Sequence, residues 1–233
     1  MSICFCTLAI HPTYRERARL LCRDAPDVPW VVLTDVPADF ADLPVRAVAH
    51  EATGPMAIDY VLRIGPTGNN QGAAAYHDKR FALQAALEQA DTAIFLDADS
   101  RLAHVPVLPA LPPGLAVLPV VRNTVAGHLS TCGTWRRPAF TALAREVFGD
   151  ETRLTQARWC HETCYAVTKD GREGLFFDAW DRAARWMQEH HVFSGEGGVM
   201  GLAALHAGWG VDDECLVPLG AALRHEGGGP KRA

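Results

Sequence analysis

Hydrophobic and polar positions alternate in blocks along this chain, and the blocks predict strands and helices in turn. Short apolar runs predict strands over residues 2–8, 29–34, 45–50, 92–96, 116–121 and 163–168, with a further extended segment over 211–219. Apolar residues at helical spacing predict helices over residues 13–22, 72–89, 138–148, 173–190 and 195–207. Because strands alternate with helices through the first 120 residues, we expect an α/β fold with a mostly parallel central sheet flanked by helices.

The segments between these elements refine the prediction. Thr13 and Glu16 stand three residues apart, as in a capping box, so we expect the first helix to begin at Thr13. Residues 51–72 are rich in glycine, proline and asparagine and predict a long loop, which in a compact domain is usually functional or disordered. The chain has no evident linker or repeat, so we interpret residues 1–233 as a single domain.

Composition narrows the class of protein. Hydrophobic residues make up 48% and charged residues 21% of the 233 positions, which is ordinary for a soluble globular chain. The net charge of −5 without a basic block does not indicate a nucleic-acid partner. No apolar run reaches 18 residues and no secretion signal is evident, so we expect a cytoplasmic protein without a membrane span.

Cysteine usage agrees with that compartment. The seven cysteines are scattered, and we expect free thiols. Cys160, His161 and Cys164 lie close together, but no second cysteine or histidine pair follows at the spacing of a zinc finger. We therefore expect buried thiols there and not a zinc site.

An acidic pair follows one of the predicted strands. The apolar run over residues 93–96 ends in Asp97-Ala-Asp99. In an extended segment, positions i and i+2 point to the same side, so both carboxylates aim at one place and repel each other unless a cation lies close by. Mg²⁺ and Mn²⁺ prefer oxygen ligands, and phosphates often complete their coordination. The pair therefore predicts metal-assisted handling of a diphosphate, although two solvated acids in a loop would give the same motif.

Other polar residues lie where they could join the acidic pair. Ligands of open α/β sheets bind beyond the carboxyl ends of the strands, and Ala9, Asp35, Asp97 and Asn123 occupy such ends in the predicted sheet. A nucleotide base and ribose could lie against the end of the first strand, near Thr7, Ala9 and Tyr14. This arrangement favours one shared cleft.

Positive charge and further ligands come from two other segments. Lys79 and Arg80, on the helix before the acidic strand, could pair with a phosphate or with the carboxylates, or they could lie on a solvated helix face. His225, Gly228 and Lys231 stand at three-residue spacing in the tail, where they could close over a ligand or belong to a frayed terminus. Glu196, at a predicted helix start, is either an acceptor contact or general base, or a carboxylate stabilised by the helix dipole.

Three of these features together resemble the GT-A glycosyltransferases, and most closely the glycogenin and lipopolysaccharide galactosyltransferase group. The opening Thr7-Leu-Ala9 followed by Tyr14 is similar to the nucleotide-binding start of that family. Lys79 precedes Leu-Asp97-Ala-Asp99 as a lysine does in the family, and the tail fits its His-x-x-Gly-x-x-Lys motif.

The resemblance implies a fold, a metal and a reaction. It implies a single GT-A domain of Rossmann-like type, with a nucleotide-sugar-binding half over residues 1–121, an acceptor-side half over 122–215 and a tail over 216–233 that closes on the donor. Asp97, Asp99 and His225 would bind Mn²⁺ or Mg²⁺, and Lys231 would contact the diphosphate.

The implied reaction is transfer of a hexose from a UDP-sugar to an acceptor hydroxyl, with retention of configuration. Asp97, Asp99 and Glu196 are the candidate catalytic residues, and Thr7, Ala9, Tyr14, Asp35, Lys79, Asp97 and Lys231 the candidate donor contacts. The acceptor could be a saccharide, a small molecule or a protein. Two other classes remain open: a sugar-phosphate nucleotidyltransferase, which would usually have a glycine-rich loop after the first strand, and a non-catalytic nucleotide-binding protein.

Overall fold

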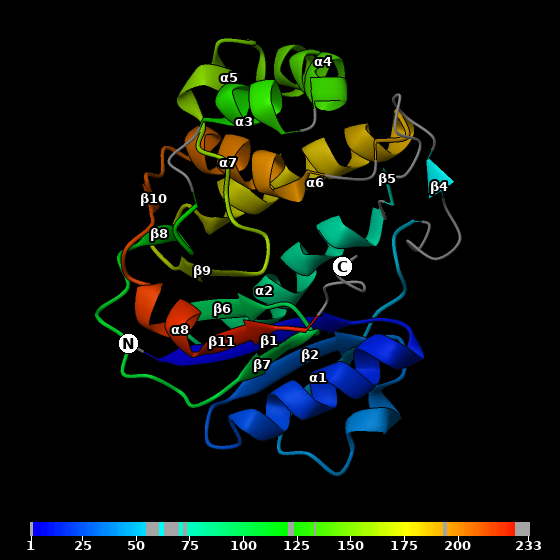
Figure 1. Ribbon diagram of the computed structural model, residues 1–233, viewed down its shortest axis with the longest axis vertical. Helices are drawn as coiled ribbons and strands as arrows, with labels where there is room; N and C mark the ends of the chain where they lie inside the picture. Colours follow the sequence, from blue (N-terminus) through cyan, green and yellow to red (C-terminus); the bar gives the residue numbers. More distant parts are fainter. Residues whose placement is uncertain are drawn as a thin grey trace, which may run out of the picture.

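A seven-stranded mixed sheet forms the centre of the computed structural model, which describes residues 2–54, 61–62, 70–71, 74–120, 124–132, 134–192 and 195–226 (Figure 1). The strand order is β10-β8-β9-β6-β1-β2-β3. The strands are β1 (Ile3–Ala9), β2 (Trp30–Thr34), β3 (Arg46–Ala49), β6 (Thr92–Leu96), β8 (Gly114–Val117), β9 (Cys164–Thr168) and β10 (Val211–Asp212). Neighbouring strands run parallel except at β9, which is antiparallel to both β6 and β8. The expected α/β fold with a mostly parallel sheet is confirmed.

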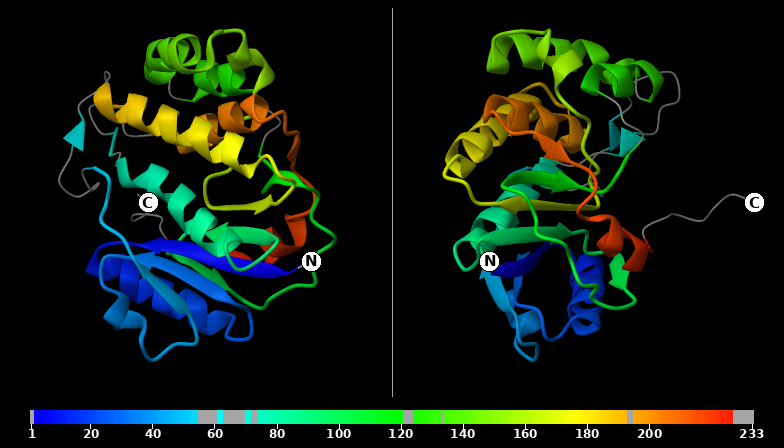
Figure 2. Two further views of the ribbon diagram at one scale, coloured as in Figure 1. Left: turned by 180° about the vertical axis from the view of Figure 1, so that it is seen from behind. Right: turned by 90° about the vertical axis from the view of Figure 1, so that its left-hand side faces the viewer.

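Helices cover both faces of this sheet. On one face lie α1 (Pro12–Asp24) and α8 (Val217–Ala222), and on the other α2 (Lys79–Leu87), α6 (Glu173–Glu189) and α7 (Glu196–His206). A further layer outside α6 and α7 consists of α3 (Val125–Thr131), α4 (Arg137–Phe148) and α5 (Arg153–Gln156) (Figures 1 and 2). The remaining short elements are η1 (Pro37–Phe40), η2 (Ala74–Asp78), η3 (Thr134–Arg136), β4 (Val61–Leu62), β5 (Asn70–Gln71), β7 (Ser100–Leu102) and β11 (Leu223–His225).

The alternation of side chains along β1 divides the hydrophobic core into two clusters. Cys4 and Cys6 pack into the cluster under α2 and α6, whereas Phe5 and Ala9 pack into the cluster under α1. All seven cysteines are free thiols, as expected. No helix in the described part of the chain is long and apolar enough to cross a membrane.

Strand order reverses beside β1. The chain proceeds from β1 through β2 to β3 at one edge of the sheet and then returns to place β6 on the other side of β1. In open α/β sheets such a reversal opens a crevice beyond the carboxyl ends of the two strands concerned, and ligands bind there. The fold therefore marks the ends of β1 and β6 as the place to look for a site.

Several predicted boundaries are wrong. The capping box is absent because α1 begins one residue earlier, at Pro12, and its N-cap is His11, whose Nδ1 accepts from the Thr13 N–H at 3.4 Å. Of the helix expected over residues 72–89, the first two residues lie outside the described part, Ala74–Asp78 form a 3₁₀ turn, and the α-helix covers only Lys79–Leu87. Residues 211–219 are not one extended segment, because only Val211–Asp212 pairs with the sheet and α8 begins at Val217.

Candidate metal centre at the carboxyl end of the sheet

A tight turn after β6 places both aspartates at the crevice. All five residues of β6 are buried, and the strand ends where the Asp97 N–H donates to the Thr163 carbonyl at 2.9 Å. The Ser100 N–H then donates back to the Asp97 carbonyl at 2.9 Å, which closes the turn into β7. The Asp97 and Asp99 side chains are only 20% and 13% exposed, so both carboxylates lie largely out of water.

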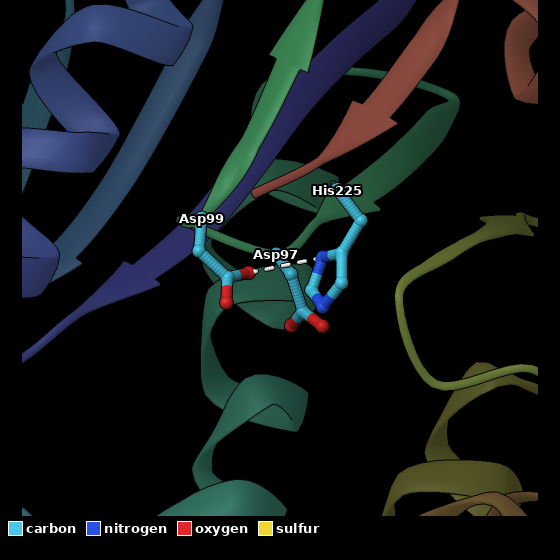
Figure 3. A group of neighbouring side chains, drawn as sticks. All are labelled: Asp97, Asp99 and His225. Carbon is cyan, nitrogen blue, oxygen red and sulfur yellow. Dashed lines mark ion pairs between the residues drawn. The ribbon is translucent and has the colours of Figure 1, made fainter. Parts of the chain in front are cut away.

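The third member of the centre comes from the end of the chain. β11 pairs antiparallel with β7 and sets His225 opposite Ser100, and the Glu226 N–H donates to the Asp99 carbonyl at 2.8 Å. His225 Nδ1 lies 3.3 Å from Asp99 Oδ1, with the Asp97 carboxylate beside both groups (Figure 3). Backbone pairing therefore holds His225 in a strand. Lys231 and Gly228, the other members of the tail motif, lie outside the described residues.

The three side chains converge closely enough to share one ion. One ligand atom from each of Asp97, Asp99 and His225 lies within 4.8 Å of the other two. Ligands about 2.1–2.4 Å from an ion are at most roughly 4.2–4.8 Å apart, so little movement is needed for joint coordination. Two carboxylate oxygens and one imidazole nitrogen form a donor set that fits Mn²⁺, and less well Mg²⁺.

Lys79 is the cation at the base of this centre. Its ammonium lies 2.8 Å from Asp97 Oδ1 and 2.6 Å from Glu196 Oε1, and it donates to the Glu162 carbonyl at 3.1 Å. These contacts use all three protons of the ammonium. Burial lowers the pKa of Lys79, but the two carboxylates outweigh it and hold that pKa well above its usual value. Burial raises the pKa of Asp97 to about 6 even though Lys79 opposes the change.

Glu196 reaches Lys79 because α7 approaches the loop before β9 very closely. A Cβ at Gly197 would lie 2.2 Å from the Cys160 carbonyl oxygen, and one at Gly201 would lie 1.7 Å from the Arg158 carbonyl oxygen. Only glycine permits this contact. It brings the Glu196 side chain, which is buried, to the start of α7 beside Lys79.

Glu162 is a further carboxylate in this region; its place just before a predicted strand left open whether it faced the cleft or the surface. Its Oε1 accepts from the Gly197 N–H at 2.9 Å. Burial raises the pKa of Glu162 to about 7, and the charge of Glu196 adds to the rise. The antiparallel pairing of β9 with β6, with Leu96 opposite Cys164, is what sets the residues before β9 beside those after β6.

The predicted donor contacts are distributed unevenly around the centre. Tyr14 is half-buried, and its pKa is raised by burial first and then by the charges of Asp99 and Asp97. Thr7 and Ala9 are fully buried in β1 and expose no side-chain surface. Asp35 follows β2, where Arg15 Nη1 binds its carboxylate at 2.8 Å.

The positive charge near the acidic pair differs from expectation. Arg80 does not supply it, since its guanidinium binds Asp181 of α6 at 2.7 Å. Arg17, on α1, which sequence reasoning did not consider, lies 3.7 Å from Asp99. Tyr14 and Arg17 are three residues apart on α1, and this spacing would have indicated that both lie on one face of the helix.

No family model matches this chain, and no curated protein shows a significant match to its sequence.

Proposed function

We propose that this protein is a metal-dependent glycosyltransferase that moves a hexose from a UDP-sugar to an acceptor hydroxyl, with retention of configuration. The observation that carries the proposal is the convergence of Asp97, Asp99 and His225 at the point where strand order reverses. This is where α/β sheets bind nucleotides. The GT-A fold is part of the same proposal, and the mixed sheet with its single antiparallel strand β9 is compatible with it.

The departing diphosphate explains the need for this donor set. A bound Mn²⁺ would act as a Lewis acid that offsets the charge developing on the diphosphate, without a proton donor. Asp97 and Asp99 would hold it from the turn after β6 and His225 from β11. Loss of such stabilisation costs several kcal/mol of activation free energy, or about a thousandfold in rate.

Lys79 acts in this proposal as a positioning residue. Its protons are all used by Asp97, Glu196 and the Glu162 carbonyl, so it fixes the two carboxylates in place. Asp97 Oδ2 then stays available to the metal while Oδ1 is held by the ammonium. Glu196, held in place by the same ammonium, contacts the acceptor hydroxyl in this proposal. Tyr14 and Arg17, both on α1, border the metal on the donor side.

Calorimetric titration of UDP tests the proposal. Wild-type protein is expected to bind UDP in the presence of Mn²⁺ and to lose that binding in EDTA. Asp99→Asn keeps the shape of the side chain and is expected to weaken Mn²⁺-dependent binding at least a hundredfold while the melting temperature is retained. Asp178→Asn, an exposed aspartate on α6, is the matched control and should bind as wild type. Equal UDP affinity with and without Mn²⁺ would refute the metal role.

Release of UDP identifies the donor. A panel of UDP-hexoses incubated with Mn²⁺ should show one preferred donor whose slow hydrolysis releases UDP, and Asp99→Asn should abolish that release. Glu196→Gln should retain Mn²⁺-dependent UDP binding while transfer falls. Binding of UDP by a protein that releases none from any donor would favour a nucleotide-binding protein without catalysis.

A further inference from the structure

The segment before β9 carries a histidine that the proposed function leaves unexplained. The sequence places Cys160, His161 and Cys164 close together, but both thiols are buried. Burial raises the pKa of Cys160 to about 12 and also raises that of Cys164, so both are protonated thiols at neutral pH, whereas zinc binds thiolates. His161 therefore needs an explanation other than a zinc site.

Hydrogen bonds hold this segment against the candidate metal centre. The Asp97 N–H donates to the Thr163 carbonyl at 2.9 Å, and Lys79, which also pairs with Asp97, donates to the Glu162 carbonyl at 3.1 Å. The His161 ring folds back onto the same stretch, because its Nδ1 accepts from the Thr163 N–H at 3.2 Å. The ring is thus fixed beside the backbone that contacts Asp97.

The second nitrogen of the His161 ring is an open donor. A backbone N–H can only donate, so Nδ1 is the acceptor and the proton of the neutral ring lies on Nε2. Burial lowers the pKa of His161, and the charges of His225 and Lys79 lower it further, so the ring is neutral at physiological pH. Nε2 has no hydrogen-bond partner among the described residues. The side chain is partly exposed, and Nε2 is not among the unpartnered atoms that the protein encloses, so a ligand can reach it.

A neutral N–H at this position suits an oxygen atom of a ligand and not the metal itself. A protonated Nε2 has no lone pair for an ion, and the group of described residues that could share one consists of Asp97, Asp99 and His225. Phosphate oxygens accept hydrogen bonds, and bonds to an ionised acceptor are the stronger ones. A neutral ring also leaves the carboxylates to the metal, with which a further cation would compete.

We propose that His161 Nε2 donates a hydrogen bond to a phosphate oxygen of the diphosphate at the metal centre and so orients it. The inference rests on the proposed function for the diphosphate, but it requires neither uridine nor a hexose. His161 keeps its proton throughout and takes no part in bond breaking.

Calorimetric titration of pyrophosphate in the presence of Mn²⁺ tests this contact on the full chain. In His161→Asn the amide oxygen can accept from the Thr163 N–H in place of Nδ1, but no donor remains at the position of Nε2. We expect the Mn²⁺-dependent affinity for pyrophosphate to fall at least tenfold while the melting temperature is retained. His161→Gln can place an amide N–H near the position of Nε2 but gives up the Nδ1 acceptor. It should keep most of the affinity and lose some thermal stability.

The ring nitrogens give a readout that a merely structural role would not move. In ¹H–¹⁵N spectra of the histidine rings, recorded with diamagnetic Mg²⁺, the His161 Nε2 resonance should shift on addition of pyrophosphate and not on addition of chloride at equal ionic strength. His104→Asn, at an exposed site, is the matched control and should bind pyrophosphate as wild type does.

The outcomes separate this inference from the proposed function. Equal affinity of wild type and His161→Asn for pyrophosphate, or an unchanged His161 resonance, would overturn the inference even where UDP binds with Mn²⁺. A loss in His161→Asn that is confined to UDP-sugars would also overturn it, because the contact would then be with the sugar. Binding of pyrophosphate that depends on His161, in a protein that does not prefer UDP to pyrophosphate, would support the inference and contradict the proposed donor.

Discussion

Replacing Lys79 with methionine tests whether one buried cation holds the carboxylates of the centre in place. Lys79 is 7% exposed and lies between Asp97 and Glu196, with the Phe95 ring 5.3 Å from its ammonium. Methionine has a similar shape but no charge. The stability lost in this variant therefore measures the electrostatic role of Lys79. Removing one partner of a buried ion pair costs about 3–5 kcal/mol, because the other charge is left uncompensated. For a chain of this size that corresponds to a fall in melting temperature of roughly 6–20 °C.

The pH dependence of the same variant identifies the cause. Without the ammonium, the buried Asp97 carboxylate loses the cation that opposes the effect of burial, and its pKa in the folded state rises further above that of the unfolded chain. The native state then holds protons that the unfolded state releases, so the variant loses stability as pH increases. Urea unfolding should show a larger deficit at pH 8 than at pH 5. Adding Glu196→Gln should recover part of it, and Lys169→Met, at an exposed site, should cost little. A deficit that is equal at both pH values, or no larger than that of Lys169→Met, would refute this explanation.

Two further predictions concern the loop before β9. Burial raises the pKa of Glu162 to about 7, from an ordinary value of 4.5, so the folded protein loses stability as pH rises through that interval. Glu162→Gln keeps an acceptor for the Gly197 N–H but carries no charge. In urea titrations it should be more stable than wild type by on the order of 2 kcal/mol at pH 8, with no gain at pH 4.5. A gain that is equal at both pH values would contradict the assignment. Gly201→Ala places a methyl group against the Arg158 carbonyl, so calorimetric melting should show a loss of at least about 3 kcal/mol, whereas Gly210→Ala, where a Cβ meets nothing within 4 Å, should cost far less.

The sequence predicts the centre of the fold well because the buried strands and helices there are marked by apolar positions that can be recognised along the chain. The strand over residues 92–96 is found with both ends as expected, since a fully apolar run stops abruptly at two aspartates. The long helix α6 ends within one residue of its predicted end for a similar reason, because its apolar face repeats over almost five turns. The same local signals placed Asp97 and Asp99 at the end of a strand, where they are found.

Pairings between distant segments were beyond such reasoning. Nothing local in residues 163–168 indicates that this strand runs antiparallel between β6 and β8, and that orientation alone brings Glu162 to the centre. The tail was ambiguous for the same reason. His225 is ordered by hydrogen bonds from β11 to β7, and these depend on α8, which sequence reasoning took for extended chain. Arg80 was misplaced because helical spacing does not reveal which of two adjacent cations faces the sheet.

Charge around the centre gives a physical reason why it suits a cation. The carboxylates of Asp97, Asp99, Glu162 and Glu196 lie in one region, where, among the described lysines and arginines, Lys79 and Arg17 form ion pairs with them. Burial raises the pKa of Asp97 to about 6 and that of Glu162 to about 7, and the charge of Glu196 adds to both rises. Keeping these carboxylates ionised is therefore costly without further positive charge nearby. A divalent cation bound by Asp97, Asp99 and His225 would supply positive charge at neutral pH. Lys79 would meanwhile stay paired with Glu196.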